Sequence, residues 1–386
     1  MRLFPALLLP LAIPALLAAQ AAPDRGAFVT RLGVDTVAVE TFTRTATTLS
    51  GDRLLRSPRV SLLHYEATLG RDGRIIRLEA SSRPGNRLDL PPLQSSVVEI
   101  GTDSATVTLK QGDSTRAYRL AVRPGAVPMF NTVNALYGQM TRQLAAARLD
   151  SMDVDQIFPG VLTAQPTYVA RAGRDTMAIG YFGSPIHARV DARGDLLGLQ
   201  GSLTTVKVLV TREPDVNLMG IARSFAAAEL QTGPAGQMSP RDTARGTVAG
   251  ATIWVDYGRP HVRGRKIFGG IVPFGEVWRT GANAATQLST DRPLVFGSDT
   301  VPAGLYTLWS LPTESGAELI FNHQTGQWGT DHDPAQDFLK VTIVQSALDT
   351  PVEAFSIAVR PGTGQGGTLV FEWDRTRWEV PFSTTR

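Results

Sequence analysis

Short runs in which hydrophobic and polar residues alternate fill the first half of the chain. Residues 36–42 and 105–109 show this two-residue period, which is typical of a strand with one buried face. Gly and Asp separate such runs at 71–74, 111–114 and 191–195, where glycine tolerates positive φ and aspartate bonds nearby amides. These connections predict hairpins, and the whole region is expected to form an antiparallel meander of roughly ten strands.

Helical spacing interrupts the alternation twice. Apolar residues three and four positions apart predict a helix at 131–149, with Asn131 as its N-cap. A second helix is predicted from about Asp215 to the Gly233-Pro234 stop signal. We therefore expect residues 24–230 to form an antiparallel meander or half barrel with one or two helices. A curved sheet closing on a helix would enclose an apolar cavity, as in lipid-carrier and lipocalin-like half barrels.

The composition changes after residues 231–245, which are rich in Gly, Pro, Thr and Ser and predict a linker. All six Trp residues follow this segment. Short β-prone runs with turns between them, and no helical period, fill residues 246–386. This pattern predicts a Trp-rich antiparallel β-sandwich, so the protein is expected to be mainly β with two domains.

Residues 1–21 have the features of a secretory signal peptide. Arg2 precedes an apolar run, and Ala19-Gln20-Ala21 forms a small-x-small cleavage signal. The alternative, a membrane anchor, is disfavoured because three prolines break the run and it is shorter than the roughly 20 apolar residues of a span. We expect export to the periplasm or the extracellular space, with no membrane span in the mature chain. The chain has no Cys, so no disulfides are expected.

The charges nearly balance, since 38 Lys and Arg residues face 35 Asp and Glu residues. No block of five or six like charges occurs, and a nucleic-acid partner is therefore not expected. No glycine-rich phosphate-binding motif is present. The sequence accordingly predicts no cofactor.

Several motifs in the second half carry a family resemblance. They are residues 257–269, Trp278-Arg279-Thr280-Gly281-Ala282-Asn283 and Gln327-Trp328-Gly329. Over about 247–360 the chain resembles the bacterial exported family catalogued as domain of unknown function 2911. The resemblance implies no agreed activity. Where the family usually carries a Tyr-containing segment after Trp-Gly, this chain reads Thr330-Asp331-His332-Asp333.

Five residues of these motifs suit ligand binding. Arginine supplies a fork of donors for anionic oxygens, asparagine supplies a donor and an acceptor, and tryptophan supplies a flat apolar face. We therefore expect a sugar or a small anion to bind against Arg265, Trp278, Arg279, Asn283 and Trp328. The alternative is structural: Arg279 and Asn283 would bond the carbonyl groups of a glycine-rich turn.

A histidine and an aspartate form a candidate catalytic pair. His261 lies five residues after Asp256, and a His oriented by a carboxylate acts as a general base. No Gly-x-Ser-x-Gly motif accompanies them, so a serine nucleophile has no support. The alternative is a surface histidine in a basic turn.

One acidic loop contains candidate metal ligands, namely His323, Asp331, His332 and Asp333. Adjacent side chains of an extended segment point in opposite directions, and no zinc-type spacing is present. No metal site is therefore predicted, and a solvated loop is the favoured interpretation.

Taken together, these features favour a non-enzymatic binding or envelope-associated module for a small ligand, which is apolar, a sugar or an anion. The alternative is a hydrolase that uses His261 with a carboxylate partner. A purely structural module, with its tryptophans packed in the core, is the third interpretation.

Overall fold

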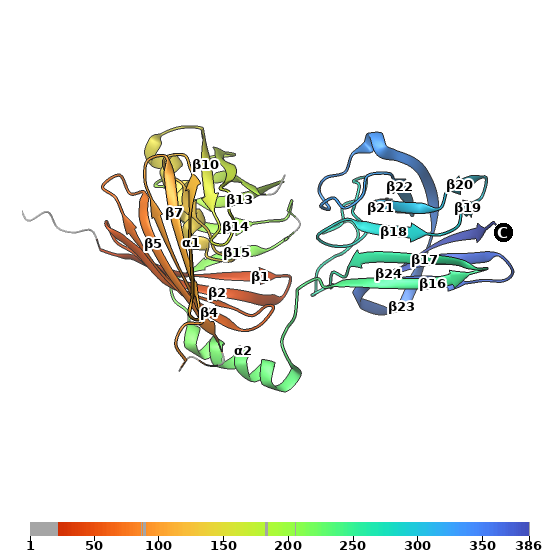
Figure 1. The fold of residues 1–386 in the computed structure, drawn as a ribbon, viewed down its shortest axis with the longest axis horizontal. Coiled ribbons are helices and arrows are strands. Elements are labelled where there is room, and N and C mark those ends of the chain that lie inside the picture. The colour runs from red at the N-terminus through yellow and green to blue at the C-terminus, as the bar shows by residue number, and fades with distance from the viewer. Residues whose placement is uncertain (1–21, 86, 88–89, 182–183, 205, 386) are drawn as a thin grey trace, which may run out of the picture.

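The computed structural model describes residues 22–85, 87, 90–181, 184–204 and 206–385, so the predicted signal peptide, 1–21, lies outside the described residues. The chain is mainly β and forms two lobes, each built on one sheet (Figure 1). Two α-helices, α1 (Asn134–Ala147) and α2 (Leu218–Thr232), both belong to the N-terminal lobe. No helix in the described ranges is long and apolar enough to cross a membrane.

The N-terminal sheet is a meander of fifteen strands, more than the ten or so predicted. Its order runs from β8 down to β1, continues with β15 and returns to β9, so that the first and last strands pair at its centre. The pairs are antiparallel except β9 with β10. The strands are β1 (Asp24–Leu32), β2 (Asp35–Arg44), β3 (Thr48–Leu55), β4 (Ser61–Leu69), β5 (Ile75–Pro84), β6 (Gln94–Ile100), β7 (Ser104–Gln111), β8 (Ser114–Ala121), β9 (Val127–Pro128), β10 (Ser151–Ile157), β11 (Gln165–Arg171), β12 (Thr176–Tyr181), β13 (Ser184–Val190), β14 (Leu196–Gln200) and β15 (Leu209–Glu213).

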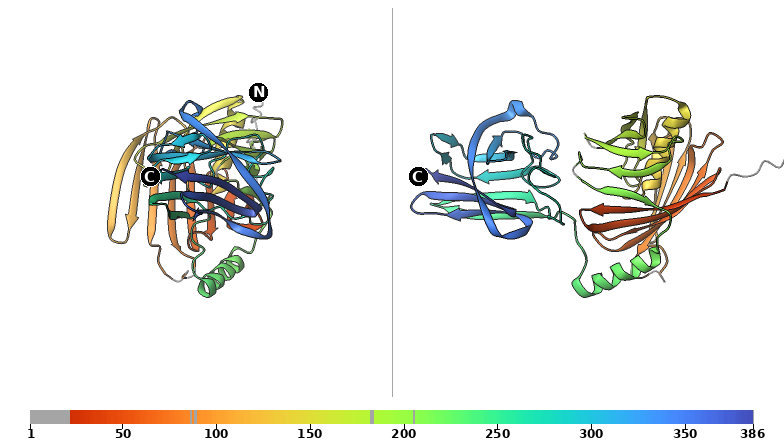
Figure 2. Two further views of the ribbon diagram at one scale, coloured as in Figure 1. Left: turned by 90° about the vertical axis from the view of Figure 1, so that its right-hand side faces the viewer. Right: turned by 180° about the vertical axis from the view of Figure 1, so that it is seen from behind.

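Helix α1 lies on the concave side of this sheet (Figure 2). Leu136, Met140 and Leu144 are fully buried and pack in one cluster with residues of both arms of the sheet, including Tyr65 and Ile179. The chain's own side chains therefore fill the interior in which an apolar ligand cavity is predicted.

The N-terminus of α1 is capped differently from the prediction. The helix begins at Asn134 with Val133 at the N-cap, and no side chain of its own caps it, so Asn131 does not have the predicted role. Instead, the buried carboxylate of Glu40 on β2 accepts hydrogen bonds from the backbone N–H groups of Asn134 (2.6 Å) and Ala135 (3.3 Å). A carboxylate at this end of a helix is favoured by the helix dipole.

Helix α2 packs on the outside of the same sheet. The Asn217 side chain caps it by accepting the N–H of Gly220 at 2.8 Å. Leu218 and Ala222 face Val39 and Leu54. From this helix the chain crosses to the second lobe (Figure 1).

The C-terminal sheet has nine antiparallel strands in the order β16-β17-β18-β21-β22-β23-β24-β19-β20. Strand β16 begins at Arg241, inside the segment 231–245 that is predicted as a linker. The sheet folds over a core in which Trp278 stacks on Trp373, with ring centroids 5.7 Å apart. Its elements are β16 (Arg241–Val248), β17 (Ala251–Gly258), β18 (Thr286–Thr290), β19 (Leu294–Phe296), β20 (Asp299–Val301), β21 (Gly304–Pro312), β22 (Ala317–Asn322), the short 3-10 helix η1 (Pro334–Gln336), β23 (Asp337–Pro361) and β24 (Gly366–Thr384).

Candidate functional site

The segment from Trp278 to Asn283 is a tight loop between the core and β18. The backbone N–H of Trp278 donates to Ser310 O (2.7 Å), and the N–H of Ser310 donates back to Trp278 O (2.8 Å). The Thr280 hydroxyl lies 3.1 Å from the Ser310 hydroxyl. The buried Trp278 ring belongs to the aromatic core, so this residue anchors the loop and is not available as a ligand platform.

Asn283 also has a structural role. Its backbone φ is 62°, a left-handed conformation that asparagine tolerates better than most residues. Its side-chain amide donates to Ser239 O at 3.4 Å, which ties the loop to the segment before β16. This geometry agrees with the structural interpretation of the sequence, in which Asn283 bonds a backbone carbonyl group.

Arg265 is likewise bonded to main-chain oxygens. Its Nε donates to Val262 O at 3.0 Å and its Nη2 donates to His261 O at 2.5 Å. Burial, followed by the positive charge of Arg263, lowers its pKa. Arg265 therefore braces the turn that contains His261.

Arg279 differs from the other motif residues because its guanidinium has no hydrogen-bond or carboxylate partner among the described residues. Its Nε is buried without a partner, and burial alone lowers its pKa to about 10. The side chain crosses Gly329 so closely that a Cβ there would lie 2.0 Å from Arg279 Cδ. The fold thus buries the positive charge of Arg279 without the carboxylate that normally pairs with a buried arginine.

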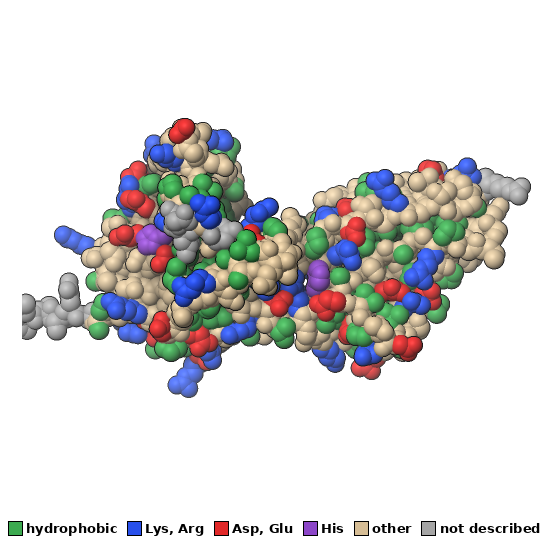
Figure 3. Space-filling view, turned by 90° about the horizontal axis from the view of Figure 1, so that it is seen from below, with side chains coloured by type: hydrophobic (Ala, Val, Ile, Leu, Met, Phe, Trp, Pro, Cys, Tyr) green, Lys and Arg blue, Asp and Glu red, His purple; other side chains and the backbone are tan. Residues whose placement is uncertain are grey.

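The two lobes meet at the waist visible in Figure 3. Val34 of the turn between β1 and β2 donates its N–H to Arg263 O at 3.1 Å, and the Arg263 guanidinium pairs with Asp35. Gly33 is required in this turn, because its φ is 62° and a Cβ would lie 2.2 Å from Arg263 O. The turns of the two lobes are therefore in direct backbone contact.

Lys207 brings a second cation from the N-terminal lobe. It lies in the loop between β14 and β15, and its Nζ donates to Ser202 O at 2.7 Å. Burial, followed by the positive charges of Arg279 and Arg265, lowers its pKa to about 8 against the opposing effect of Glu276. The charge of Arg279 therefore reaches Lys207 across the boundary between the lobes, and a bound anion would relieve this repulsion.

Exposed apolar residues adjoin these cations in the sequence. Trp328 precedes Gly329 and is 40% exposed, and Phe274 and Val277 are also exposed. Of the five predicted ligand residues, Arg279 and Trp328 thus remain available to a ligand. We call Arg279, Lys207 and Trp328 the junction site.

His261 and Asp256 are not brought together. The Asp256 carboxylate is engaged by Arg241, whose Nη2 and Nε lie 2.5 and 3.0 Å from Oδ2. His261 is bonded by the backbone of Met238, its Nδ1 is buried without a partner, and burial together with Arg263 lowers its pKa. The pair therefore lacks the carboxylate that would orient a general base.

The four candidate metal ligands have separate roles. His323 stacks on Phe338 with centroids 4.2 Å apart, and His332 Nε2 lies 2.9 Å from Asp337 Oδ1. Asp333 caps η1 by accepting the N–H of Ala335, and Asp331 Oδ1 accepts the hydroxyl of Thr330. Within the part of the chain that the structure describes, no three such side chains could hold a metal ion.

Sequence analysis identifies Arg279 by its motif but misses Lys207. That lysine lies 72 positions earlier, in a loop with no motif of its own. Only the docking of the two lobes brings it near Arg279, and no local pattern encodes that contact.

Comparison with known proteins gives structural likenesses and one family. No curated protein matches the chain. A DUF1089 family protein from Pseudomonas aeruginosa is similar at 9% identity and a TM-score of 0.33, over 44% of this chain and 92% of that one. A β-barrel-like protein of domain of unknown function DUF1849 from Brucella abortus is similar at 12% identity and a TM-score of 0.33, over 50% of this chain and 95% of that one. These likenesses are too low to support an inference about this chain.

Residues 239–382, which form the C-terminal lobe, match the model of the family described as protein of unknown function (DUF2911), as the motifs predict.

Proposed function

We propose that the protein is an exported binding module that holds a small anion against Arg279 at the junction between its lobes. The observation that carries this proposal is the guanidinium of Arg279, which is desolvated and has no partner in the described chain. Structural arginines are normally paired with carboxylates or bonded to carbonyl groups, as Arg265 is. An anionic ligand would supply the missing charge.

Lys207 supports an anion in preference to a neutral sugar. The positive charge of Arg279 is among the causes that lower the pKa of Lys207, so the two cations are costly to hold in the free protein, and a bound anion would recover part of that cost. Trp328 offers an exposed ring beside the site, so a carboxylate with an apolar or aromatic body fits both features. Benzoate is a suitable first probe.

The test replaces Arg279 by Met, which keeps most of the volume and removes the charge. Since no partner is lost, we expect the free energy of unfolding to stay equal or to rise. The benzoate-induced rise in melting temperature should disappear. The exposed Arg245 on β16, which is not part of the junction site, provides the matched control, and Arg245→Met should retain the benzoate response.

The structural interpretation makes the opposite prediction. If Arg279 stabilises its loop, Arg279→Met would unfold at a clearly lower denaturant concentration. A benzoate response that is equal in wild type and Arg279→Met would contradict the proposal.

A further inference from the structure

A cavity of about 400 Å³ opens in the N-terminal lobe at the C-terminal end of α1, and we call it the mouth pocket. Its polar lining comes from α1, β2 and two turns: Arg44, Asp72, Gln139, Arg142, Gln143, Arg148 and Arg193. The one carboxylate among them, Asp72, is paired with Arg74 at 3.6 Å. Arg44, Arg142 and Arg193 also line a neighbouring cavity of about 710 Å³. Ligand pockets typically have volumes of about 300–1,000 Å³. The mouth pocket is therefore large enough for a small organic molecule.

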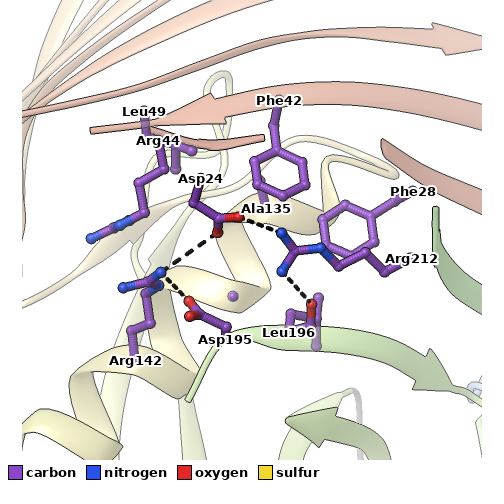
Figure 4. A pocket seen from close by; sticks show the side chains of 11 residues that line it. Asp24, Phe28, Phe42, Arg44, Leu49, Ala135, Arg142, Asp195, Leu196 and Arg212 are labelled. Carbon is purple, nitrogen blue, oxygen red and sulfur yellow. Dashed lines mark hydrogen bonds and ion pairs between the residues drawn. The ribbon is translucent and has the colours of Figure 1, made fainter. Parts of the chain in front are cut away.

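Two of its arginines are neutralised by the fold. Arg142 lies between Asp24, 3.6 Å away, and Asp195, with which it forms a close ion pair (Figure 4). Arg193 Nη2 lies 3.1 Å from Asp195 Oδ2. Asp24 is also bound by Arg212 at 2.5 Å, which links the first strand to the last. These ion pairs leave Arg142 and Arg193 with carboxylate partners.

The other two arginines have no carboxylate partner among the described residues. Arg44 donates to Gln139 Oε1 at 2.7 Å, and Figure 4 shows its guanidinium on the same side as that of Arg142. Burial and the charge of Arg142 lower the pKa of Arg44 to about 10, against the opposing charges of Asp195 and Asp24. Arg148, the C-cap of α1, is exposed. The pocket thus carries surplus positive charge.

The amide of Gln143 is the second, independent feature. This residue is only 8% exposed, and neither its Oε1 nor its Nε2 has a hydrogen-bond partner within the described chain. The neighbouring Gln139, by contrast, donates to Gly73 O and accepts from Arg44. An unsatisfied buried amide costs about 1–3 kcal/mol. In the structure Oε1 faces Gly125. A turn of the Gln143 side chain toward the cavity would let hydroxyl groups of a ligand, which both donate and accept, satisfy both of its atoms.

We infer that the mouth pocket is a second ligand site, and that it takes a small anion rich in hydroxyl groups, of the sugar-phosphate class. Arg44 and Arg148 supply the charge for the phosphate, and Gln143 supplies a donor and an acceptor for the hydroxyls. This site lies in the other lobe from Arg279 and does not depend on the junction site.

The test is calorimetric titration of the full chain with D-glucose 6-phosphate. Arg44→Gln should weaken binding about tenfold or more, the loss typical of one charge-assisted contact. Ala146 lines the pocket and is exposed, so Ala146→Trp fills the space without removing a polar contact and should abolish binding. The exposed Arg116 on β8 gives the matched control, and Arg116→Gln should bind as wild type does.

Two further ligands and one further variant show which groups of the ligand are bound and at which site. Glucose, which has no charge, and inorganic phosphate, which has no sugar hydroxyls, should each bind more weakly than the sugar phosphate. Arg279→Met should leave this binding unchanged, so the two sites can fail independently. The inference is overturned if glucose 6-phosphate does not bind at millimolar concentration, or if Arg44→Gln and Ala146→Trp both bind it like wild type.

Discussion

Glu40 is a completely buried acid at the start of α1. Burial raises its pKa to about 7, although hydrogen bonds from Tyr65, Asn134 and Ala135 oppose the shift. In the unfolded chain its pKa returns to 4.5. The folded protein therefore binds one more proton than the unfolded chain between these two pH values.

This difference makes stability depend on pH with a definite sign. The stabilising contribution of protonated Glu40 is fully present below pH 4.5 and is lost as the pH rises through about 7. The loss amounts to about 3 kcal/mol at most. Glu40→Gln mimics the protonated acid, so from about pH 5 to about pH 8 the wild type should lose stability relative to the variant. Urea unfolding of both proteins across this pH range measures the difference. Free energies of unfolding that change with pH in parallel in the two proteins would refute the prediction.

The sequence identifies residues better than it identifies their partners. Trp278, Arg279 and Asn283 stand out in one motif, and the structure gives each a distinct position. Sequence analysis assigns Asp256 to His261, yet Arg241 binds it from the neighbouring strand β16. That pairing depends on strand register, which alternation alone does not specify.

Helix α2 illustrates how one element depends on a few contacts. Ala222 is fully buried against the outer face of the N-terminal sheet. We expect Ala222→Asp to lower the free energy of unfolding by about 2–4 kcal/mol, because it buries an unpaired charge. Ala227 on the same helix is exposed, so Ala227→Asp should cost far less. Equal losses measured by denaturant unfolding would show that the docking of α2 contributes nothing.

Among the elements, those with a strong period are predicted well. The helix expected at 131–149 is observed at Asn134–Ala147, and alternating runs such as 36–42 lie in strands. Strand β16 is missed because its sequence, mostly polar with Gly246, lacks an apolar face. It lies at the edge of the sheet and is held by backbone bonds to β17. Such bonds leave no side-chain pattern.

At the scale of the whole molecule, the junction site predicts a pH dependence of ligand binding. Lys207 loses its proton near pH 8 in the free protein, while Arg279, whose pKa is about 10, keeps its charge in this range. Benzoate affinity should therefore fall as the pH rises through about 8. Lys207→Met should bind more weakly at neutral pH and lose this dependence. Calorimetric titration of the wild type and of Lys207→Met with benzoate at several pH values measures this difference. If the affinity of Lys207→Met changed with pH as that of the wild type does, a role for this lysine would be contradicted.

The central claim, that the junction holds an anion against Arg279, is tested most directly by locating one. Crystals grown with 4-bromobenzoate allow the bromine to be found by its anomalous scattering. We predict a peak near Trp328, with the carboxylate within hydrogen-bond distance of the Arg279 guanidinium and close to Lys207. Bromine peaks elsewhere on the molecule, with none at the junction, would contradict the account.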